Sequence, residues 1–308
     1  MNQPKLKSII FVAGLALFLS PITEAATINV ACPGPSLQAA VDSATAGDII
    51  QVTGICSQNI LIRNEKQRIT IDGGGGVNGV GGATVSGPSA SSPVFNVRGK
   101  GILIQGLIIT GGSRGVHVNR GSNAVINNNE IHTTPNDGIL VNQLAFAVIT
   151  NNNIHNNATH GIRVTETSIA RIGFNQGTDT AASPNTIQSN GGRGIHISHS
   201  NARIVGNTIS GNADDGIQVF KLSQADIAGN TINGNGGDGI VVGQNSGVNL
   251  GNDTVVDFFD DPNSTTVNNA GFGLRCFIGA YADGVLGTLN GGSGATSFGA
   301  SCIDSTIP

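Results

Sequence analysis

Three consecutive copies of a short repeat in the middle of the chain are unusually rich in ionisable side chains. Each copy contributes three positions, spaced three residues apart: His160, Arg163 and Glu166; Arg193, His196 and His199; Asp215, Gln218 and Lys221. Eight of these nine residues are ionisable, whereas only 11% of the whole chain is charged. Such a cluster either forms a solvated strand face or binds a charged ligand.

An acidic sugar chain is a ligand whose chemistry fits these groups. Elimination across a uronic acid needs a cation that neutralises its carboxylate, for which Arg163 and Arg193 are candidates, and a base that removes the neighbouring proton. Imidazole titrates near neutral pH, so His160 and His196 are the candidate bases. Hydrolysis would instead need two carboxylates, and those available are Asp214, Asp215, Asp238 and Glu166.

The other side chains of these copies are candidates for contacting the substrate. Sugar sites often contain aromatic platforms, but the chain has no tryptophan and a single tyrosine. A phenylalanine of the third copy is a possible substitute. The candidate substrate-binding residues are Glu166, His199, Gln218, Phe220 and Lys221.

A metal ion is a second possibility. Four aspartates fall within one insertion of the repeat: Asp253, Asp257, Asp260 and Asp261. Carboxylate oxygens suit calcium, although this spacing does not match an EF-hand loop. Calcium is therefore a candidate cofactor, and a solvated acidic loop is the alternative.

A pair of histidines offers another metal hypothesis. His132 and His155 occupy equivalent positions in adjacent copies of the repeat. Two imidazoles at one site can bind a transition metal. A ladder of side chains at a structural corner is the alternative.

The candidate residues lie on a repeated phrase of Gly, an aliphatic residue, one variable residue and a second aliphatic residue. Six copies and a looser seventh begin at Gly115, Gly138, Gly161, Gly194, Gly216, Gly239 and Gly273. Subtraction of these numbers gives spacings of 23, 23, 33, 22, 23 and 34 residues, so two spacings are one period plus an insertion. A fixed period of this size is typical of a solenoid. The alternation predicts short strands whose variable residue points outward.

An asparagine recurs in the same register, at Asn129, Asn152, Asn185, Asn207 and Asn230. Asparagine tolerates the left-handed backbone that a sharp corner needs. Stacked side-chain amides can also hydrogen-bond to one another. This column predicts a structural ladder along coils that stack about 4.8 Å apart.

The Gly-Ile-x-Val copies, the asparagine column and the period near 22–23 residues resemble a right-handed parallel β-helix protein of the pectate-lyase-like superfamily. The resemblance spans roughly residues 36–280 and implies an all-β fold, a right-handed parallel β-helix with a short N-terminal capping helix. It also implies a protein that binds or processes an acidic polysaccharide, with lyase-like or hydrolase-like chemistry if it is an enzyme. Asp214-Asp215-Gly216 and His160-Gly161 resemble two motifs of polygalacturonases, but their order is reversed and the downstream Arg-x-Lys motif is missing.

The chain divides into four expected segments. Lys5 and Lys7 precede an apolar run from Ile9 to Leu19, a pattern typical of a secretory signal. Ser36 before an apolar pattern predicts the N-cap of a short helix that covers the open end of the solenoid. The segments are a signal peptide at 1–25, an N-terminal cap at 26–58, a β-helix at 59–280 and a C-terminal tail or cap at 281–308.

Four cysteines lie two at each end of the expected fold. In an exported chain, periplasmic or extracellular, this arrangement fits two disulfides. Three connectivities are possible, and proximity favours Cys32–Cys56 and Cys276–Cys302.

Charge and hydropathy exclude some classes of partner. The net charge is −4, from 15 basic and 19 acidic residues, and it becomes −5 when the two lysines and one glutamate of residues 1–25 are removed. This balance argues against nucleic acid or an anionic membrane. The apolar run near the N-terminus is too short to span a bilayer. A non-catalytic structural or adhesive rod at the cell surface is the alternative function.

Overall fold

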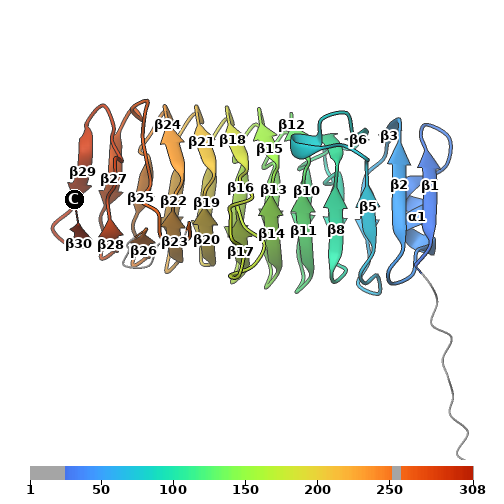
Figure 1. Cartoon of the computed structure of the whole chain (residues 1–308), viewed down its shortest axis with the longest axis horizontal. Helices are drawn as coiled ribbons and strands as arrows, with labels where there is room; N and C mark the ends of the chain where they lie inside the picture. The colour runs from blue at the N-terminus through green and yellow to red at the C-terminus, as the bar shows by residue number, and fades with distance from the viewer. Residues whose placement is uncertain (1–24, 252–257, 308) are drawn as a thin grey trace, which may run out of the picture.

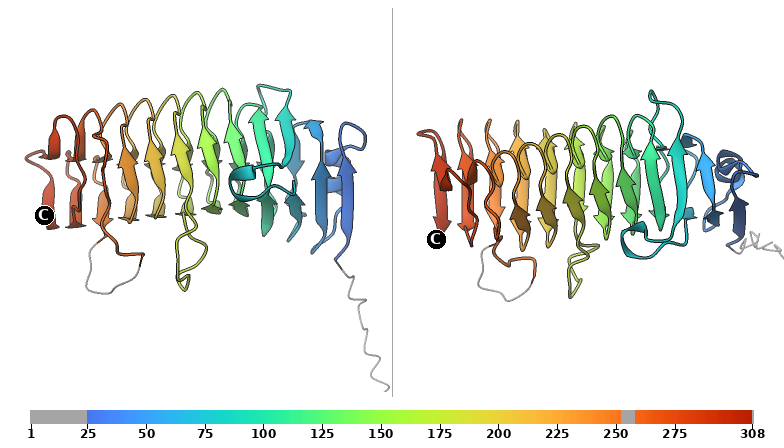
Figure 2. Two further views of the ribbon diagram at one scale, coloured as in Figure 1. Left: turned by 45° about the horizontal axis from the view of Figure 1, so that its top comes forward. Right: turned by 90° about the horizontal axis from the view of Figure 1, so that it is seen from above.

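Short aliphatic strands stack into a parallel β-helix in the computed structural model, which describes residues 25–251 and 258–307 (Figures 1 and 2). Each full coil passes through three sheets in turn, and the strand pairs within these sheets are parallel. Within the described ranges the helical elements are α1 (Leu37–Ser43) and the 3-10 turn η1 (Val77–Gly79). The expected all-β solenoid is confirmed. The expected signal peptide lies outside the described residues, apart from Ala25.

Across the described residues the sheets contain twelve, ten and eight strands. The twelve-stranded sheet contains β1 (Thr27–Ala31), β2 (Ile49–Thr53), β5 (Thr70–Asp72), β8 (Ile102–Gln105), β11 (Asn123–Asn127), β14 (Phe146–Thr150), β17 (Ile169–Ile172), β20 (Asn201–Val205), β23 (Gln224–Ala228), β26 (Gly247–Leu250), β28 (Tyr281–Val285) and β30 (Ile303–Ile307). The ten-stranded sheet contains β4 (Ile60–Ile62), β7 (Phe95–Val97), β10 (Val116–Val118), β13 (Ile139–Val141), β16 (Ile162–Thr165), β19 (Ile195–Ser198), β22 (Ile217–Phe220), β25 (Ile240–Val242), β27 (Phe272–Cys276) and β29 (Gly294–Phe298). The eight-stranded sheet contains β3 (Ile55–Ser57), β6 (Ala83–Gly87), β9 (Leu107–Gly111), β12 (Glu130–His132), β15 (Asn153–His155), β18 (Thr186–Gln188), β21 (Thr208–Ser210) and β24 (Thr231–Asn233).

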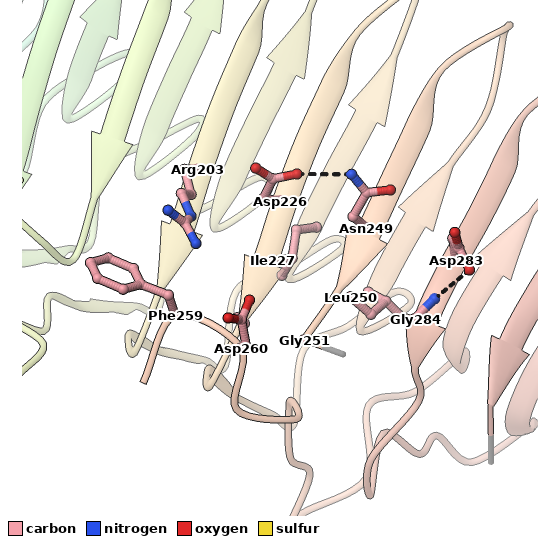
Figure 3. A pocket seen from close by; sticks show the side chains of 11 residues that line it. Arg203, Asp226, Ile227, Asn249, Leu250, Gly251, Phe259, Asp260, Asp283 and Gly284 are labelled. Atoms are coloured by element: carbon pink, nitrogen blue, oxygen red, sulfur yellow. Dashed lines mark hydrogen bonds between the residues drawn. The ribbon is translucent and has the colours of Figure 1, made fainter. Parts of the chain in front are cut away.

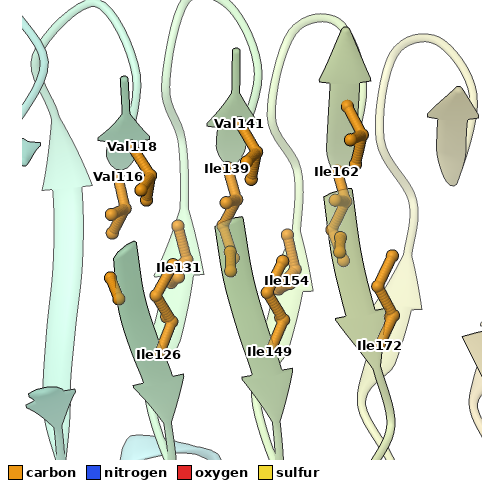
Figure 4. Packing of buried hydrophobic residues seen from close by; sticks show 14 of the residues in the cluster. Val116, Val118, Ile126, Ile131, Ile139, Val141, Ile149, Ile154, Ile162 and Ile172 are labelled. Atoms are coloured by element: carbon orange, nitrogen blue, oxygen red, sulfur yellow. The ribbon is translucent and has the colours of Figure 1, made fainter. Parts of the chain in front are cut away.

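The core consists of columns of aliphatic side chains that run along the interior (Figure 4). Val116, Ile139 and Ile162 are register partners on successive strands and are all fully buried. Ile131 and Ile154 form a matching column from the eight-stranded sheet. No single coil could bury these side chains alone, so the stack stabilises itself cooperatively.

The glycine that opens each repeat is required by close packing. A Cβ atom on Gly138 would lie 2.7 Å from Cγ2 of Ile154 and 2.8 Å from the carbonyl oxygen of Gly161 on the next coil. Both distances are shorter than van der Waals contact. The repeat therefore begins with Gly because the corner leaves no room for a side chain.

The asparagine column forms the expected ladder, but its members do not have the left-handed backbone that the sequence suggested; the preceding residues Asn128 and Asn151 do, with φ of 57° and 56°. The backbone N–H and the side-chain Nδ2 of Asn152 both donate to Oδ1 of Asn185, at 3.0 and 2.9 Å, and Nδ2 also donates to the carbonyl of Ile126 at 2.9 Å. A second ladder, which the sequence analysis missed, follows the eight-stranded sheet and contains Asn157, Asn190, Asn212, Asn235 and Asn269. Both ladders satisfy buried backbone groups at the corners.

Both ends of the described fold carry the expected disulfides, Cys32–Cys56 and Cys276–Cys302. At the first end α1 covers the core with Leu37 and Val41, and the hydroxyl of Ser36 accepts a hydrogen bond from the Ala39 N–H at 3.2 Å. At the other end β28 and β30 extend the twelve-stranded sheet as far as Ile307.

The two insertions leave the coil at the same corner, between the twelve-stranded and eight-stranded sheets. The first follows β17 and the second follows β26, and both project from the same side of the solenoid (Figure 2). Their described parts meet: the ring centroids of Phe174 and Phe259 are 5.1 Å apart in an edge-to-face arrangement. The insertions thus form one wall beside the outer face of the twelve-stranded sheet.

Candidate functional site

The outer face of the ten-stranded sheet brings the central candidates together. Arg163 on β16 pairs in register with His196 on β19, and His196 pairs with Gln218 on β22. Strand parity places these side chains outside, because the aliphatic residues on either side of each point into the core. The sequence therefore predicted correctly that these three residues are neighbours.

Two histidines from adjacent coils are stacked on this face. The rings of His160 and His196 are nearly parallel, with centroids 5.0 Å apart and planes inclined by 9°. The backbone N–H of Arg193 donates to Nδ1 of His160 at 3.1 Å, so a neutral His160 carries its proton on Nε2. Nδ1 of His196 is buried and has no hydrogen-bond partner among the described residues.

Burial keeps both imidazoles neutral at physiological pH. Desolvation lowers the pKa of His160 below its usual value, with a further lowering by Arg193 and Arg163. Desolvation, His160 and the two arginines lower the pKa of His196 to about 3. A general base works best when its pKa lies near the working pH. His196 is therefore poorly suited to act as a base in this unliganded arrangement.

The charge of Arg193 is already neutralised. Its Nη2 lies 2.9 Å from Oδ2 of Asp214, and its Nε lies 3.4 Å from Oδ2 of Asp215. Asp215 also accepts hydrogen bonds from the Asp238 N–H at 2.9 Å and from Nε2 of Gln218 at 3.2 Å. Burial raises the pKa of the Asp215 carboxyl above its usual value. Arg193 and Asp215 thus hold each other in place.

The same pairing recurs along the face. Arg114 lies 3.2 Å from Asp137, and Arg275 lies 2.9 Å from Asp238, measured between the closest nitrogen and oxygen atoms. The sequence analysis missed these two ion pairs. The sequence feature that could have predicted these ion pairs is two oppositely charged residues about one coil apart, as in Arg114 and Asp137.

Arg163 differs from these arginines. Among the described residues it forms no ion pair. Its buried Nε has no hydrogen-bond partner, which is also true of Nε in Arg193 and Arg275. Its neighbours in the column are Leu140 and the neutral His196. A guanidinium without a counter-charge is a ready binding group for a planar carboxylate.

Three of the candidate substrate contacts lie at the corner that follows the strands. Glu166, His199 and Lys221 adopt left-handed backbone conformations, with φ of 56°, 51° and 60°. Phe220 is half-buried and packs edge-to-face on Phe277 at 5.5 Å between centroids. Gln218 is buried and bound to Asp215, as described above. Contact of these residues with a substrate stays a prediction.

The metal hypotheses remain predictions. Asp253 and Asp257 lie outside the described residues, while Asp260 and Asp261 belong to the wall of the second insertion. Within residues 25–251 and 258–307, no group of three or more His, Cys, Asp or Glu side chains is arranged to hold a metal ion. His132 and His155 form a stacked pair with centroids 5.2 Å apart, and His155 Nε2 contacts Glu130 Oε1 at 3.1 Å.

Two hollows that the sequence analysis missed lie on a different face. They occupy about 410 and 350 Å³ on the outer side of the twelve-stranded sheet, beside the insertions, and Figure 3 shows the larger of the two. The sequence feature that could have predicted these hollows is the pair of insertions at the same point of the coil.

The sequence matches the model of the right handed beta helix region over residues 50–201 and 170–277, which together span well over half of the chain. The chain therefore belongs to this family, and the expected right-handed parallel β-helix is confirmed.

Solved structures share the fold. A pectate lyase, Pel9A, is 15% identical with a TM-score of 0.62, covering 92% of this chain and 79% of its own. An alginate lyase from Paenibacillus sp. str. FPU-7 is 20% identical with a TM-score of 0.53, covering 90% and 99%. A double mutant of the periplasmic alginate epimerase AlgG is 14% identical with a TM-score of 0.54, covering 86% and 70%. These likenesses confirm the pectate-lyase-like architecture.

No curated protein matches this chain significantly in sequence. In the part of the chain that the structure describes, no helix has the length and apolar character required to cross a membrane.

Proposed function

We propose that this protein is exported and binds an acidic polysaccharide along the outer face of the ten-stranded sheet, with Arg163 as the partner of a sugar carboxylate. The observation that carries the proposal is the unpaired guanidinium of Arg163, because Arg114, Arg193 and Arg275 on the same face are each held by an aspartate. The structural neighbours named as pectate lyase, alginate lyase and alginate epimerase support an acidic glycan as the ligand class.

Processing of the bound chain would use the stacked histidines. A carboxylate bound at Arg163 adds negative charge beside His160 and His196, and a nearby opposite charge raises the pKa of an imidazole. His160 offers no free lone pair in this arrangement, because Nδ1 accepts from the Arg193 N–H and Nε2 carries the proton, so His196 would be the base once its pKa is raised. Binding has more direct support than chemistry, since the unliganded imidazoles are weak bases.

Export is supported by the two disulfides, which persist in oxidising compartments. The leader-like residues 1–25 agree with this proposal, and the destination is the periplasm or the extracellular space. A rigid structural rod is the second candidate function. The two continuous asparagine ladders and the paired charges on the outer face favour it, because they stabilise the coil without requiring a ligand.

The test is incubation of the mature protein with polygalacturonate, alginate and a neutral glucan, with and without calcium. Retardation in affinity gels reports binding, ultraviolet absorbance of unsaturated uronates reports elimination, and reducing ends report hydrolysis. We expect Arg163→Ala to abolish retardation by the acidic polymers. Arg68→Ala is the matched control, because it removes the same charge from an exposed residue that precedes β5 of the twelve-stranded sheet and lines neither hollow. Absence of any interaction with either acidic polymer would favour the rod.

A further inference from the structure

A groove runs along the outer face of the twelve-stranded sheet beside the two insertions. It consists of the two adjoining hollows described above, which share Arg203 and Asp226. Phe174 belongs to its wall from the first insertion, and Phe259 belongs to the wall from the second. We call it the loop-walled groove. It lies on a different sheet from Arg163 and its neighbours.

The wall is held in place before any ligand arrives. Phe174 and Phe259 pack edge-to-face, and Val205 joins them in a small buried cluster. The guanidinium carbon of Arg203 lies 4.4 Å from the ring centroid of Phe259 and 5.7 Å from that of Phe174. A site that is already formed loses less conformational entropy when a ligand binds.

The floor is a row of planar polar side chains from successive strands. Arg203, Asp226, Asn249 and Asp283 are register partners on β20, β23, β26 and β28 (Figure 3). Neighbouring members therefore stand about 4.8 Å apart along the groove. Asn249 Nδ2 donates to Asp226 Oδ1 at 3.0 Å, and the aspartates and Asn249 are exposed to solvent. Alternating donors and acceptors of this kind suit the hydroxyl groups of a sugar, which both donate and accept.

An aromatic ring borders the same floor. Tyr281 reaches across two coils, and its hydroxyl donates to Oε1 of Gln224 at 2.6 Å. A Cβ atom on Gly247, the residue between them, would lie 2.1 Å from Cε1 of the tyrosine ring. Gly247 therefore allows the ring to lie close against the sheet. Flat aromatic surfaces beside hydrogen-bonding groups match the apolar face and hydroxyl edge of a sugar ring.

The charge of the groove discriminates between glycans. The two hollows together are lined by two arginines, Arg171 and Arg203, and three aspartates, Asp226, Asp260 and Asp283, which gives a formal charge of −1. A polymer of uronic acids would be repelled by these carboxylates. The outer face of the ten-stranded sheet differs from the groove, because it carries an arginine without a counter-charge.

We infer that the loop-walled groove is a second carbohydrate-binding site, and that its ligand is a neutral glycan. The inference does not depend on the proposed function of the ten-stranded face. The protein would hold an uncharged glycan on one side of the solenoid whether or not it binds an acidic one on another.

Affinity gels containing galactomannan, lichenan, polygalacturonate or chitosan test this inference. We expect retardation of the full protein by at least one of the two neutral polymers. Asp226→Ala and Asn249→Ala should each weaken this interaction by about tenfold, since each removes hydrogen bonds to the ligand. Ser305→Ala is the matched control, because Ser305 is a register partner of Asp283 and lies outside both hollows. Circular dichroism checks that each variant is folded.

The outcomes separate this site from the first one. Arg163→Ala should leave binding to the neutral polymer unchanged while it abolishes binding to polygalacturonate. The inference is overturned if neither neutral polymer retards the protein, or if Asp226→Ala and Asn249→Ala bind as well as the wild type. The inference is also overturned if no neutral polymer binds and Asp226→Ala loses binding to polygalacturonate or chitosan. The groove would then bind a charged glycan.

Discussion

His160 and His196 lie face to face on adjacent coils, with their ring centroids 5.0 Å apart and their planes inclined by only 9°. Two imidazolium ions could not share this arrangement without strong repulsion, and burial disfavours charge on either ring. The pair is therefore stable only in its neutral form, which links the fold to pH.

The first prediction concerns acid stability. The folded-state pKa of His196 is about 3, below the ordinary value of 6.5, so the unfolded chain binds a proton first as the pH falls. Stability is unaffected by this group above pH 6.5 and decreases as the pH falls from 6.5 towards 3, with roughly one proton taken up on unfolding. We expect His196→Gln to show a shallower decline than the wild type in urea unfolding between pH 6.5 and 4. Identical slopes would contradict the assigned burial.

The second prediction contrasts two arginines on the same face. Arg193→Ala leaves Asp215, whose side chain is only 10% exposed, without its ion-pair partner. We expect a loss of roughly 1–3 kcal/mol in the free energy of unfolding, below the range for fully buried pairs because Arg193 is partly exposed. Arg163→Ala should change this free energy by less than about 0.5 kcal/mol, since it removes an unpaired charge. Equal effects of the two substitutions would show that Arg163 also has a structural partner.

The third prediction tests the strand register. Ile217 is fully buried on β22, so Ile217→Asp places an unpaired carboxylate in the core and should cost roughly 4 kcal/mol or more. Thr208→Asp is the control, because Thr208 is exposed on β21. We expect the first variant to lose its far-ultraviolet circular dichroism spectrum at room temperature and the second to keep it. A native spectrum for Ile217→Asp would place the residue outside the core.

The fourth prediction concerns the glycine at the repeat corner. Gly138→Ala should lower the free energy of unfolding by roughly 1–3 kcal/mol, because the new methyl group meets Ile154 and the Gly161 carbonyl within 3 Å. Gly76→Ala is the matched control, since a Cβ atom there has no heavy atom within 4 Å. Denaturant unfolding of both variants measures the difference. A tolerated Gly138→Ala would mean that adjacent coils can separate at no cost.

The periodic part of the structure could be predicted because each residue repeats the environment of its counterpart one coil away. Counting coils was enough to place Arg163 beside His196, and the register confirms it. Counting also predicted the asparagine ladder, since Asn152 and Asn185 differ by one period and one insertion. Proximity along the chain was sufficient for the two disulfides.

The remainder depends on side-chain directions and loop contacts that the period does not fix. The engagement of Arg193 by Asp214 and Asp215 depends on side-chain directions at a corner, where strand parity gives no guidance. The loop-walled groove depends on Phe174 meeting Phe259, two residues from different insertions. The pairing of Arg193 with Asp215 has a counterpart in Arg114 and Asp137. The contact of Phe174 with Phe259 has none in another coil, so the repeat carries no information about it.

The disulfides at the two ends have a mechanical consequence. In a one-dimensional stack each coil is held by its neighbours, so a terminal coil has one neighbour and opens first when the protein is heated. The disulfides Cys32–Cys56 and Cys276–Cys302 cross-link the chain at its two terminal regions. Reduction of the two disulfides would therefore leave the central coils folded while the coils unfold progressively from both ends. Thermal unfolding would then be gradual instead of a single cooperative transition.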